Sequence, residues 1–193
     1  MNVLLLGGSP SSPSTTWRLL QLVGEHLAAL GHRTVALQVR ELPAQALLRG
    51  DLDDPSIAAA AALVAEADAV VVGTPVYKAA YSGVLKSFLD LLPQDGLAGK
   101  LVLPLATGGS QSHMLALDYA LRPVLASLAP RHILPSVYAT SEQLPWRAEH
   151  GLLPVAAIAT RIEAAIEELA HALQHAPARK PAAPRAASAA VLA

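Results

Sequence analysis

Residues 2–16 read NVLLLGGSPSSPSTT, and this stretch decides the fold. Its first five residues form a continuous apolar run that ends at Gly7 and Gly8, which is typical of a short strand buried on both faces of a sheet. A loop of serine and proline follows, and from Trp17 onward apolar residues recur at helical spacing. The stretch therefore predicts one strand–loop–helix unit of a layered α/β protein.

The same unit repeats along the chain. Further strands are expected at 34–39, 69–72, 101–106 and 133–139, and helices at 17–30, 57–65, 84–92, 115–128 and 155–173. Five strands alternating with helices predict right-handed crossovers and a doubly wound parallel sheet with helices on both faces. The flavodoxin-like strand order 2-1-3-4-5 fits this α/β pattern best.

Composition sets bounds on what the protein does. Hydrophobic residues make up 53% of the 193 residues and charged residues 15%, which suits one substantial core. A formal net charge of −1 provides no basic surface, so nucleic-acid binding is not expected. Cysteine is absent, which excludes disulfides and thiolate nucleophiles, so redox chemistry requires a borrowed cofactor.

The chain is expected to form one domain over 1–175, followed by a disordered tail at 176–193. That tail is almost entirely alanine and proline with a few basic residues, and it lacks a periodic apolar face. No apolar stretch reaches the length of a membrane span, and the N-terminus lacks the pattern of a signal peptide. A cytoplasmic protein without a membrane partner is therefore expected.

Three loops are predicted to meet at one edge of the sheet, beyond the carboxyl ends of the strands, where open parallel sheets bind ligands. The first follows the first strand and offers hydroxyls and backbone N–H groups before a helix N-terminus, which favours a phosphate. It lacks a Walker A lysine and a G-x-G-x-x-G motif, so a monophosphate is the better hypothesis. Taken alone, the loop is explained equally well as a turn in which Ser14 or Thr15 caps the helix.

The other two loops suit a flat ring. TPVYKAAYSG at 74–83 offers apolar faces and backbone amides, and the glycines of TGGS at 107–110 permit close approach of the backbone. Glycines after a strand are more often ordinary turn residues. The coincidence of all three loops at one edge is what favours a bound flavin.

Three segments also resemble a known family. GSPSSPS at 8–14, TPVYKAAYSGVLKSFLDLLP at 74–93 and LPLATGGSQSHMLALDYALRPVL at 103–125, with their spacing, are similar to the NADPH-dependent FMN reductases of alkanesulfonate utilisation. The resemblance covers residues 1–173. It implies a flavodoxin-like enzyme that reduces FMN with NADPH, releases reduced FMN to a partner monooxygenase that cleaves sulfonates, and assembles as a homodimer or homotetramer.

The resemblance also implies the residues of the site. Those that match the family's cofactor-binding loops are Ser9, Ser14, Thr15 and Thr16 for the phosphate, Pro75, Val76, Tyr77 and Lys78 for the ring, and Thr107, Gly108 and Gly109 beside the ring. Many relatives carry an arginine where this chain has Ser11, so weaker phosphate binding is expected unless Arg18 or the helix N-terminus compensates. Tyr119 matches a tyrosine associated with a π-bulge at a subunit interface and with flavin transfer; otherwise it is a packed helix residue.

No catalytic side chain is expected, because hydride transfer between two stacked rings needs little acid–base help from the protein. Backbone donors near Tyr77, Lys78 and Gly109 are expected to stabilise the charge that develops on the flavin. The Lys78 side chain could attract the phosphate of NADPH, and it is explained at least equally well as a solvated loop residue. No metal site is expected, because His113 has no partner at ligand spacing and the pair His171 and His175 lies near the tail.

Other functions stay open at this point. A quinone, azo-dye or chromate reductase would retain FMN and pass its electrons to another acceptor. A non-enzymatic flavodoxin-type electron carrier would show a strongly acidic surface, which the near-neutral charge disfavours. An interaction module would bind FMN only structurally, or bind no flavin.

Overall fold

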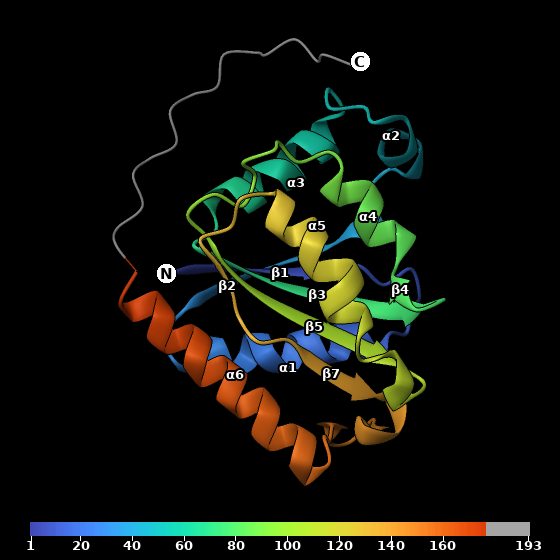
Figure 1. Cartoon of the computed structure of the whole chain (residues 1–193), viewed down its shortest axis with the longest axis vertical. Coiled ribbons are helices and arrows are strands. Elements are labelled where there is room, and N and C mark those ends of the chain that lie inside the picture. Colours follow the sequence, from blue (N-terminus) through green and yellow to red (C-terminus); the bar gives the residue numbers. More distant parts are fainter. Residues whose placement is uncertain (177–193) are drawn as a thin grey trace.

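A mostly parallel sheet forms the central layer of the computed structural model, which describes residues 1–176 (Figure 1). Its main strands are β1 (Asn2–Gly7), β2 (Arg33–Gln38), β3 (Ala69–Tyr77), β5 (Leu101–Gly108), β6 (His132–Ile133) and β7 (Val137–Thr140). They lie in the order β2-β1-β3-β5, and both β6 and β7 pair with β5. This confirms the predicted doubly wound order.

The predicted fifth strand is divided in two. β6 and β7 flank the segment 134–136, which contains Pro135. A proline has no N–H to donate to a neighbouring strand, so it interrupts the ladder of hydrogen bonds. Both halves still run parallel to β5 and occupy the edge of the sheet where one strand was expected.

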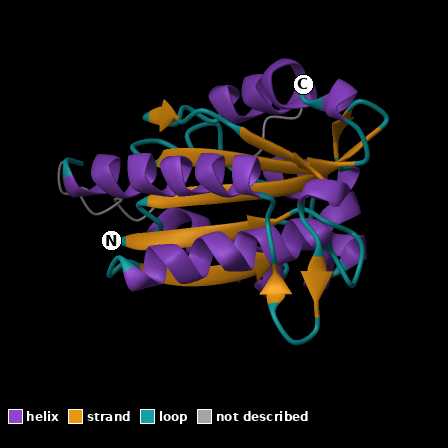
Figure 2. Cartoon of the chain, turned by 90° about the horizontal axis from the view of Figure 1, so that it is seen from below, coloured by secondary structure: helices purple, strands orange, loops and turns teal. Residues whose placement is uncertain are grey.

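Helices cover both faces of the sheet, as Figure 2 shows. On one face α1 (Thr15–Ala29) and α6 (Ala156–Gln174) pack against the strands. The opposite face is covered by the elements α2 (Ala44–Arg49), α3 (Pro55–Glu66), α4 (Gly83–Leu89) and α5 (Arg122–Ser127). The prediction of helices on both faces is therefore confirmed.

The continuous apolar runs follow from this burial on two faces. Along β1, Val3 and Leu5 point into the core under α1 and α6, whereas Leu4 and Leu6 point into the other core. Successive side chains of a strand lie on opposite faces, so a strand between two layers of helices needs an apolar residue at every position.

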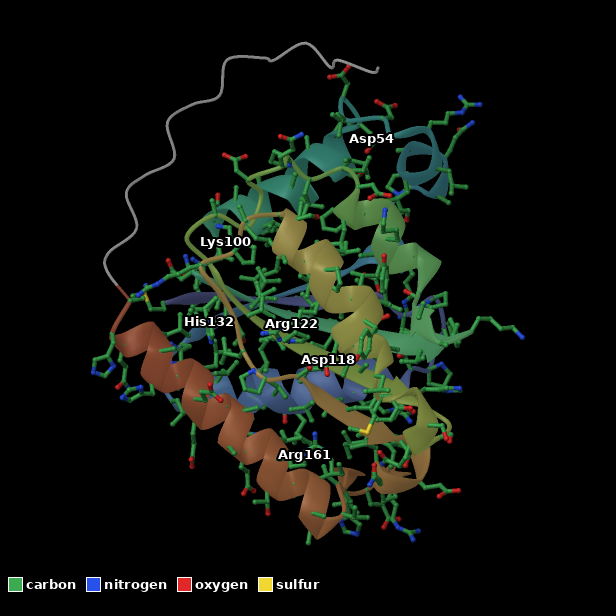
Figure 3. All side chains as sticks on the ribbon, in the orientation of Figure 1. Asp54, Lys100, Asp118, Arg122, His132 and Arg161 are labelled. Carbon is green, nitrogen blue, oxygen red and sulfur yellow. The ribbon has the colours of Figure 1, made fainter. Side chains whose placement is uncertain are left out.

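Several shorter elements were not predicted. The connection after the second strand contains the helix α2, and α3 starts at Pro55 because the carboxylate of Asp54 (labelled in Figure 3) accepts the N–H of Ser56 at 2.8 Å. β4 (Ala80–Tyr81) pairs with β3 in a hairpin. A second small hairpin consists of β8 (Trp146–Arg147) and β9 (Gly151–Leu152).

The predicted helix at 115–128 is irregular. It contains the π-helical turn η3 (Leu117–Leu121), in which the N–H of Arg122 bonds to the carbonyl of Leu117, five residues earlier, and α5 follows directly. Pro123 lies in the first turn of α5, where its missing N–H disrupts the helical pattern least. The π turn that the resemblance implied at Tyr119 is thus present.

The predictions of a disordered tail, a single domain and the absence of a membrane span have different outcomes. The predicted disordered tail at 176–193 lies outside the described residues, apart from Ala176, and the single domain over 1–175 stays a prediction. Among the residues that the structure describes, no helix combines the length and the hydropathy that crossing a membrane requires.

Candidate functional site

A cavity of about 250 Å³ opens at the carboxyl ends of the central strands, the edge toward which the arrows of β3 and β7 point in Figure 1. The residues that line it are Ser9, Ser11, Pro13, Ser14, Thr15, Thr16, Pro75, Val76, Tyr77, Thr107, Gly108, Gly109 and Ser141. The three predicted loops therefore meet around one space. Every predicted cofactor-binding residue except Lys78 lines it; that they bind a ligand stays a prediction.

The N-terminus of α1 forms one end of this cavity. Ser14 caps the helix, because its Oγ accepts the N–H of Trp17 at 3.1 Å. Its hydroxyl proton is still available to a ligand. The N–H groups of Thr15 and Thr16, the first two residues of the helix, have no carbonyl one turn earlier to bond. Unpaired N–H groups and the positive end of the helix dipole make this end suitable for an anion.

Buried hydroxyls connect the first loop to the third. Thr16 Oγ1 lies 2.6 Å from Thr107 Oγ1, and the two residues are only 2% and 4% exposed. One hydroxyl donates to the other, so the accepting hydroxyl keeps a proton for another partner. Because both residues line the cavity, an oxygen of a ligand can accept that proton.

The carbonyl groups of the first loop are bound by donors from other elements. Ser82 Oγ, which also accepts the N–H of Leu85 and so caps α4, donates to the carbonyl of Gly8. The carbonyl of Ser11 accepts a 2.6 Å hydrogen bond from Arg40 Nη1. The loop is thereby attached to the start of α4 on one side and to the end of β2 on the other.

The second loop is a tight hairpin between β3 and β4. Lys78 and Ala79 form its two-residue turn, with φ of 49° and 62°. Left-handed backbone at both central positions is typical of a type I′ turn, which normally contains asparagine and glycine. Non-glycine residues in this conformation are strained, and such strain concentrates at functional sites. The turn holds Tyr77 half-exposed at the cavity, while Lys78 lies at the tip and does not line it.

The two glycines of the third loop have different roles. A Cβ at Gly108 would lie 2.2 Å from the hydroxyl of Tyr138, which donates to the carbonyl of Ser110 at 2.6 Å. Burial raises the pKa of Tyr138 above its ordinary value of 10.0, which already keeps the hydroxyl a protonated donor at neutral pH. A Cβ at Gly109 would meet no heavy atom within 4 Å. Gly108 is therefore required by the packing of Tyr138, and Gly109 leaves space beside the cavity.

The side chains that line the cavity are all uncharged. Arg18, which the sequence suggested as a substitute cation, instead lies over the ring of Trp146, with its guanidinium carbon 3.9 Å from the ring centroid. This pair lines a separate cavity of about 200 Å³ between α1 and the β8–β9 hairpin. An uncharged lining provides no general acid or base, which suits chemistry that needs none from the protein.

Sequence reasoning missed several residues that shape the site. Ser141 directly follows β7, so the rule that ligands bind beyond strand ends would have found it. Tyr138 is a buried strand residue, which by itself predicts only core packing. Arg40 and Ser82 contact loop residues 29 and 74 positions away in the chain, and no local pattern signals such contacts.

The histidines do not form a metal site in the described part of the chain. Within residues 1–176 no three histidine, aspartate or glutamate side chains lie close enough together to bind an ion. His171, in the last turn of α6, and His175, the residue after the helix, have ring centroids 4.3 Å apart, with the rings tilted by 35°.

Tyr119 lies on the surface outside the cavity. Its side chain is 79% exposed, and Met114 and Leu115, a few residues earlier, are about half exposed. In the same region Arg122 donates to the carbonyl of Ile133 at 3.0 Å, so η3 is held against the edge of the sheet; Figure 3 labels Arg122 and Asp118 there. The exposed side chains of this segment are Met114, Leu115 and Tyr119 together with the charged Asp118, and a role at an interface stays a prediction.

Comparisons with known proteins agree on one family. Residues 1–144 match the family described as NADPH-dependent FMN reductase. The chain is 43% identical over 187 residues to the FMN reductase (NADPH) of Pseudomonas putida, and the aligned region covers 95% of this chain and 93% of that protein. It is 44% identical over 144 residues to the FMN reductase (NADPH) of Escherichia coli, 75% of each chain. A crystal structure of the NADH:FMN oxidoreductase EMOB in its apo form has a TM-score of 0.83 and 40% identity, and covers 91% of both chains.

Proposed function

The chain belongs to the NADPH-dependent FMN reductase family, and from this premise we propose that it transfers a hydride from NADPH to FMN bound in the cavity described above. The observation that carries the proposal is that one cavity is lined both by the N-terminus of α1, which suits an anion, and by the loops after β3 and β5. The phosphate binds at the N–H groups of Thr15 and Thr16. The ring lies against Tyr77 and Gly109.

The residues present fit FMN. Hydroxyls and helix N–H groups suit its phosphate, and the backbone beside Gly109, which no side chain covers, lets a flat ring approach closely. Bound FMN supplies the chemistry, since its ring accepts a hydride from a reduced nicotinamide. The hairpin of β3 and β4 and the loop after β5, which both line the cavity, would hold the flavin ring in place for the nicotinamide.

Reduced FMN leaves the site and reaches a monooxygenase that cleaves alkanesulfonates. The resemblance of the three loop segments to reductases of that type supports this step. The uncharged lining supports it too, because a phosphate held without a directly bound cation dissociates more readily. The reaction takes place in the cytoplasm, where reduced nicotinamides are available.

Steady-state oxidation of NADPH tests the proposal. With purified protein, the rate rises with free FMN and saturates, and reduced FMN accumulates when oxygen is excluded. NADH in place of NADPH measures the preference for the donor. Turnover with a quinone that does not depend on added FMN would contradict the proposal and would make the protein a quinone reductase that retains its flavin.

We further propose that the chain forms a homodimer or homotetramer through the surface around Tyr119. Replacing Tyr119 by serine is expected to shift the protein to smaller species in sedimentation velocity, because it removes a large aromatic side chain from the centre of the interface. Leu48→Ser is the matched control, since Leu48 is equally exposed but lies on α2. This assignment would be contradicted if the wild-type protein sediments as a monomer. It would also be contradicted if the Tyr119→Ser variant sediments as the same oligomer as the wild type.

A further inference from the structure

The phosphate loop lacks a cation of its own. All side chains that line the cavity, including that of Ser11 in the phosphate loop, are uncharged. A phosphate monoester carries close to two negative charges at neutral pH, since its second pKa is about 6. Transfer of such a charge from water into a partly closed site is costly unless positive charge lies nearby. Arg18 does not provide it, because its guanidinium is stacked on Trp146.

Arg40 lies against the outer side of this loop. It belongs to the 3₁₀ turn η1 (Val39–Glu41), which follows β2 directly. β2 pairs with β1 so that Gln38 lies opposite Gly7, and the next residues of both strands therefore leave the sheet side by side. This register brings the Arg40 guanidinium to the Ser11 carbonyl, where Nη1 donates at 2.6 Å.

The guanidinium is held in this position from two sides. The side chain of Arg40 is only 21% exposed, and Nη2 lies 3.7 Å from Glu41 Oε1. That carboxylate in turn accepts a 2.6 Å hydrogen bond from Gln38 Nε2. The contact with Ser11 is thus connected through the ion pair with Glu41 to the hydrogen bond from Gln38, unlike a contact of a long side chain that moves freely in solvent.

We propose that Arg40 is a positioning residue for the phosphate of FMN and supplies, from the turn η1 after β2, a cation that the lining of the cavity lacks. The inference rests on the proposed binding of FMN in this cavity. The Ser11 carbonyl bonds to Arg40, which does not line the cavity. The partial negative charge of this carbonyl is therefore kept from the anion. Arg40 also places a guanidinium next to the loop, and the exposed carboxylate of Glu41, 3.7 Å away, offsets its positive charge only in part.

The hydrogen bond of Ser82 to the Gly8 carbonyl supports this interpretation of the loop. Gly8 and Ser11 stand on either side of the short segment that enters the cavity, and each has its carbonyl bound by a donor from another element. An anion site requires N–H groups toward the ligand and carbonyl groups away from it. Ser82 binds the Gly8 carbonyl with an uncharged hydroxyl, whereas Arg40 binds the Ser11 carbonyl and also adds a positive charge.

Flavin titrations of Arg40 variants test the inference. Arg40→Met is expected to raise the dissociation constant of FMN about tenfold or more, and to change that of riboflavin, which has no phosphate, by less than about twofold. The KM for FMN rises in parallel, while kcat at saturating FMN stays within about twofold. Arg161→Met, a substitution of an exposed arginine on α6 that Figure 3 labels, is the matched control and leaves both constants unchanged.

Two further variants separate charge from hydrogen bonding. Arg40→Lys keeps the charge and a donor, and Arg40→Gln keeps a donor alone. The inference expects tighter FMN binding by Arg40→Lys than by Arg40→Gln, a difference that shrinks as potassium chloride is raised. Melting temperatures measured by circular dichroism identify any variant that is merely unstable, and the comparison of lysine with glutamine still decides if Arg40→Met does not fold.

The possible results are distinguishable. If wild-type protein binds FMN and Arg40→Met binds it equally well, the inference is wrong and the proposed function stands. If FMN and riboflavin weaken by the same factor, Arg40 only supports the loop and its assignment to the phosphate is wrong. If wild-type protein binds neither flavin, the proposed function itself is wrong, and the inference fails with it.

Discussion

Replacing Ser9 and Thr16 together by alanine raises the dissociation constant of FMN by about a hundredfold or more, while riboflavin binding changes by less than about threefold. Both residues are buried and line the phosphate end of the cavity. Ser9 Oγ accepts the N–H of Ser11 and so keeps its own proton for a ligand, and Thr16 and Thr107 share one hydrogen bond, which leaves one proton of the pair for a ligand. A hydrogen bond to a charged group contributes roughly 1.5–3 kcal/mol, so losing two gives at least this loss of affinity.

Fluorescence titration with FMN and with riboflavin measures the effect. The matched control is the double variant Ser127→Ala and Thr160→Ala, which removes one serine and one threonine hydroxyl from exposed helix positions. Their hydroxyls bond only to helix carbonyls three and four residues earlier, so flavin binding is unchanged in the control. An unaltered dissociation constant for FMN in the Ser9 and Thr16 variant would place the phosphate elsewhere.

A conservative variant separates lost contacts from lost structure. Thr16→Ala leaves the hydroxyl of Thr107 buried without its partner, which lowers the free energy of unfolding by about 1–2 kcal/mol. Thr16→Ser keeps the hydroxyl and restores most of the FMN affinity. If Thr16→Ser binds FMN as weakly as Thr16→Ala, the methyl group rather than the hydroxyl is what matters at this position.

Gly108→Ala lowers the free energy of unfolding by about 2–3 kcal/mol, and Tyr138→Phe in the same chain recovers part of the loss. The added Cβ would lie 2.2 Å from the Tyr138 hydroxyl, far inside contact distance, and Tyr138 is buried in the strand β7. Overpacking of a buried site typically costs about 1–3 kcal/mol. Removing the hydroxyl relieves the closest contact, although a ring carbon at 3.1 Å keeps the recovery incomplete.

Chemical denaturation of the four proteins of this double-mutant cycle measures the coupling. Tyr138→Phe alone costs about 1–2 kcal/mol, because the Ser110 carbonyl loses its donor. In the double variant the two losses are less than additive by about 1 kcal/mol or more. Additive losses would show that Tyr138 and Gly108 do not conflict and that another contact makes glycine necessary.

Gly109→Ala, at the next residue, separates an effect on ligand binding from an effect on stability. Its Cβ would meet no atom of the protein within 4 Å, so the free energy of unfolding changes by less than about 0.5 kcal/mol. The same methyl group occupies the space beside the cavity and raises the KM for FMN. One glycine therefore affects stability and the next affects the ligand, although the sequence presents them as an identical pair.

The sequence alone was enough to predict the sheet, its strand order and the edge at which the three loops meet around a cavity. Strands buried on two faces require apolar residues at every position, and this requirement is visible as short unbroken apolar runs such as the one in β1. Because parallel strands all end at the same edge, the loops after β1, β3 and β5 had to lie together. The placement of these loops follows from strand direction alone, without any knowledge of the distances between their atoms.

The contacts that complete the site were decided by the tertiary structure alone. Arg40 meets Ser11 across 29 positions, Thr16 meets Thr107 across 91, and the hydroxyl of Tyr138 lies where a Cβ of Gly108 would be. Local patterns report burial and secondary structure, since these depend on neighbouring residues. Which side chain reaches a given carbonyl depends instead on strand register and on how the layers pack, and only the folded chain brings those groups within hydrogen-bond distance.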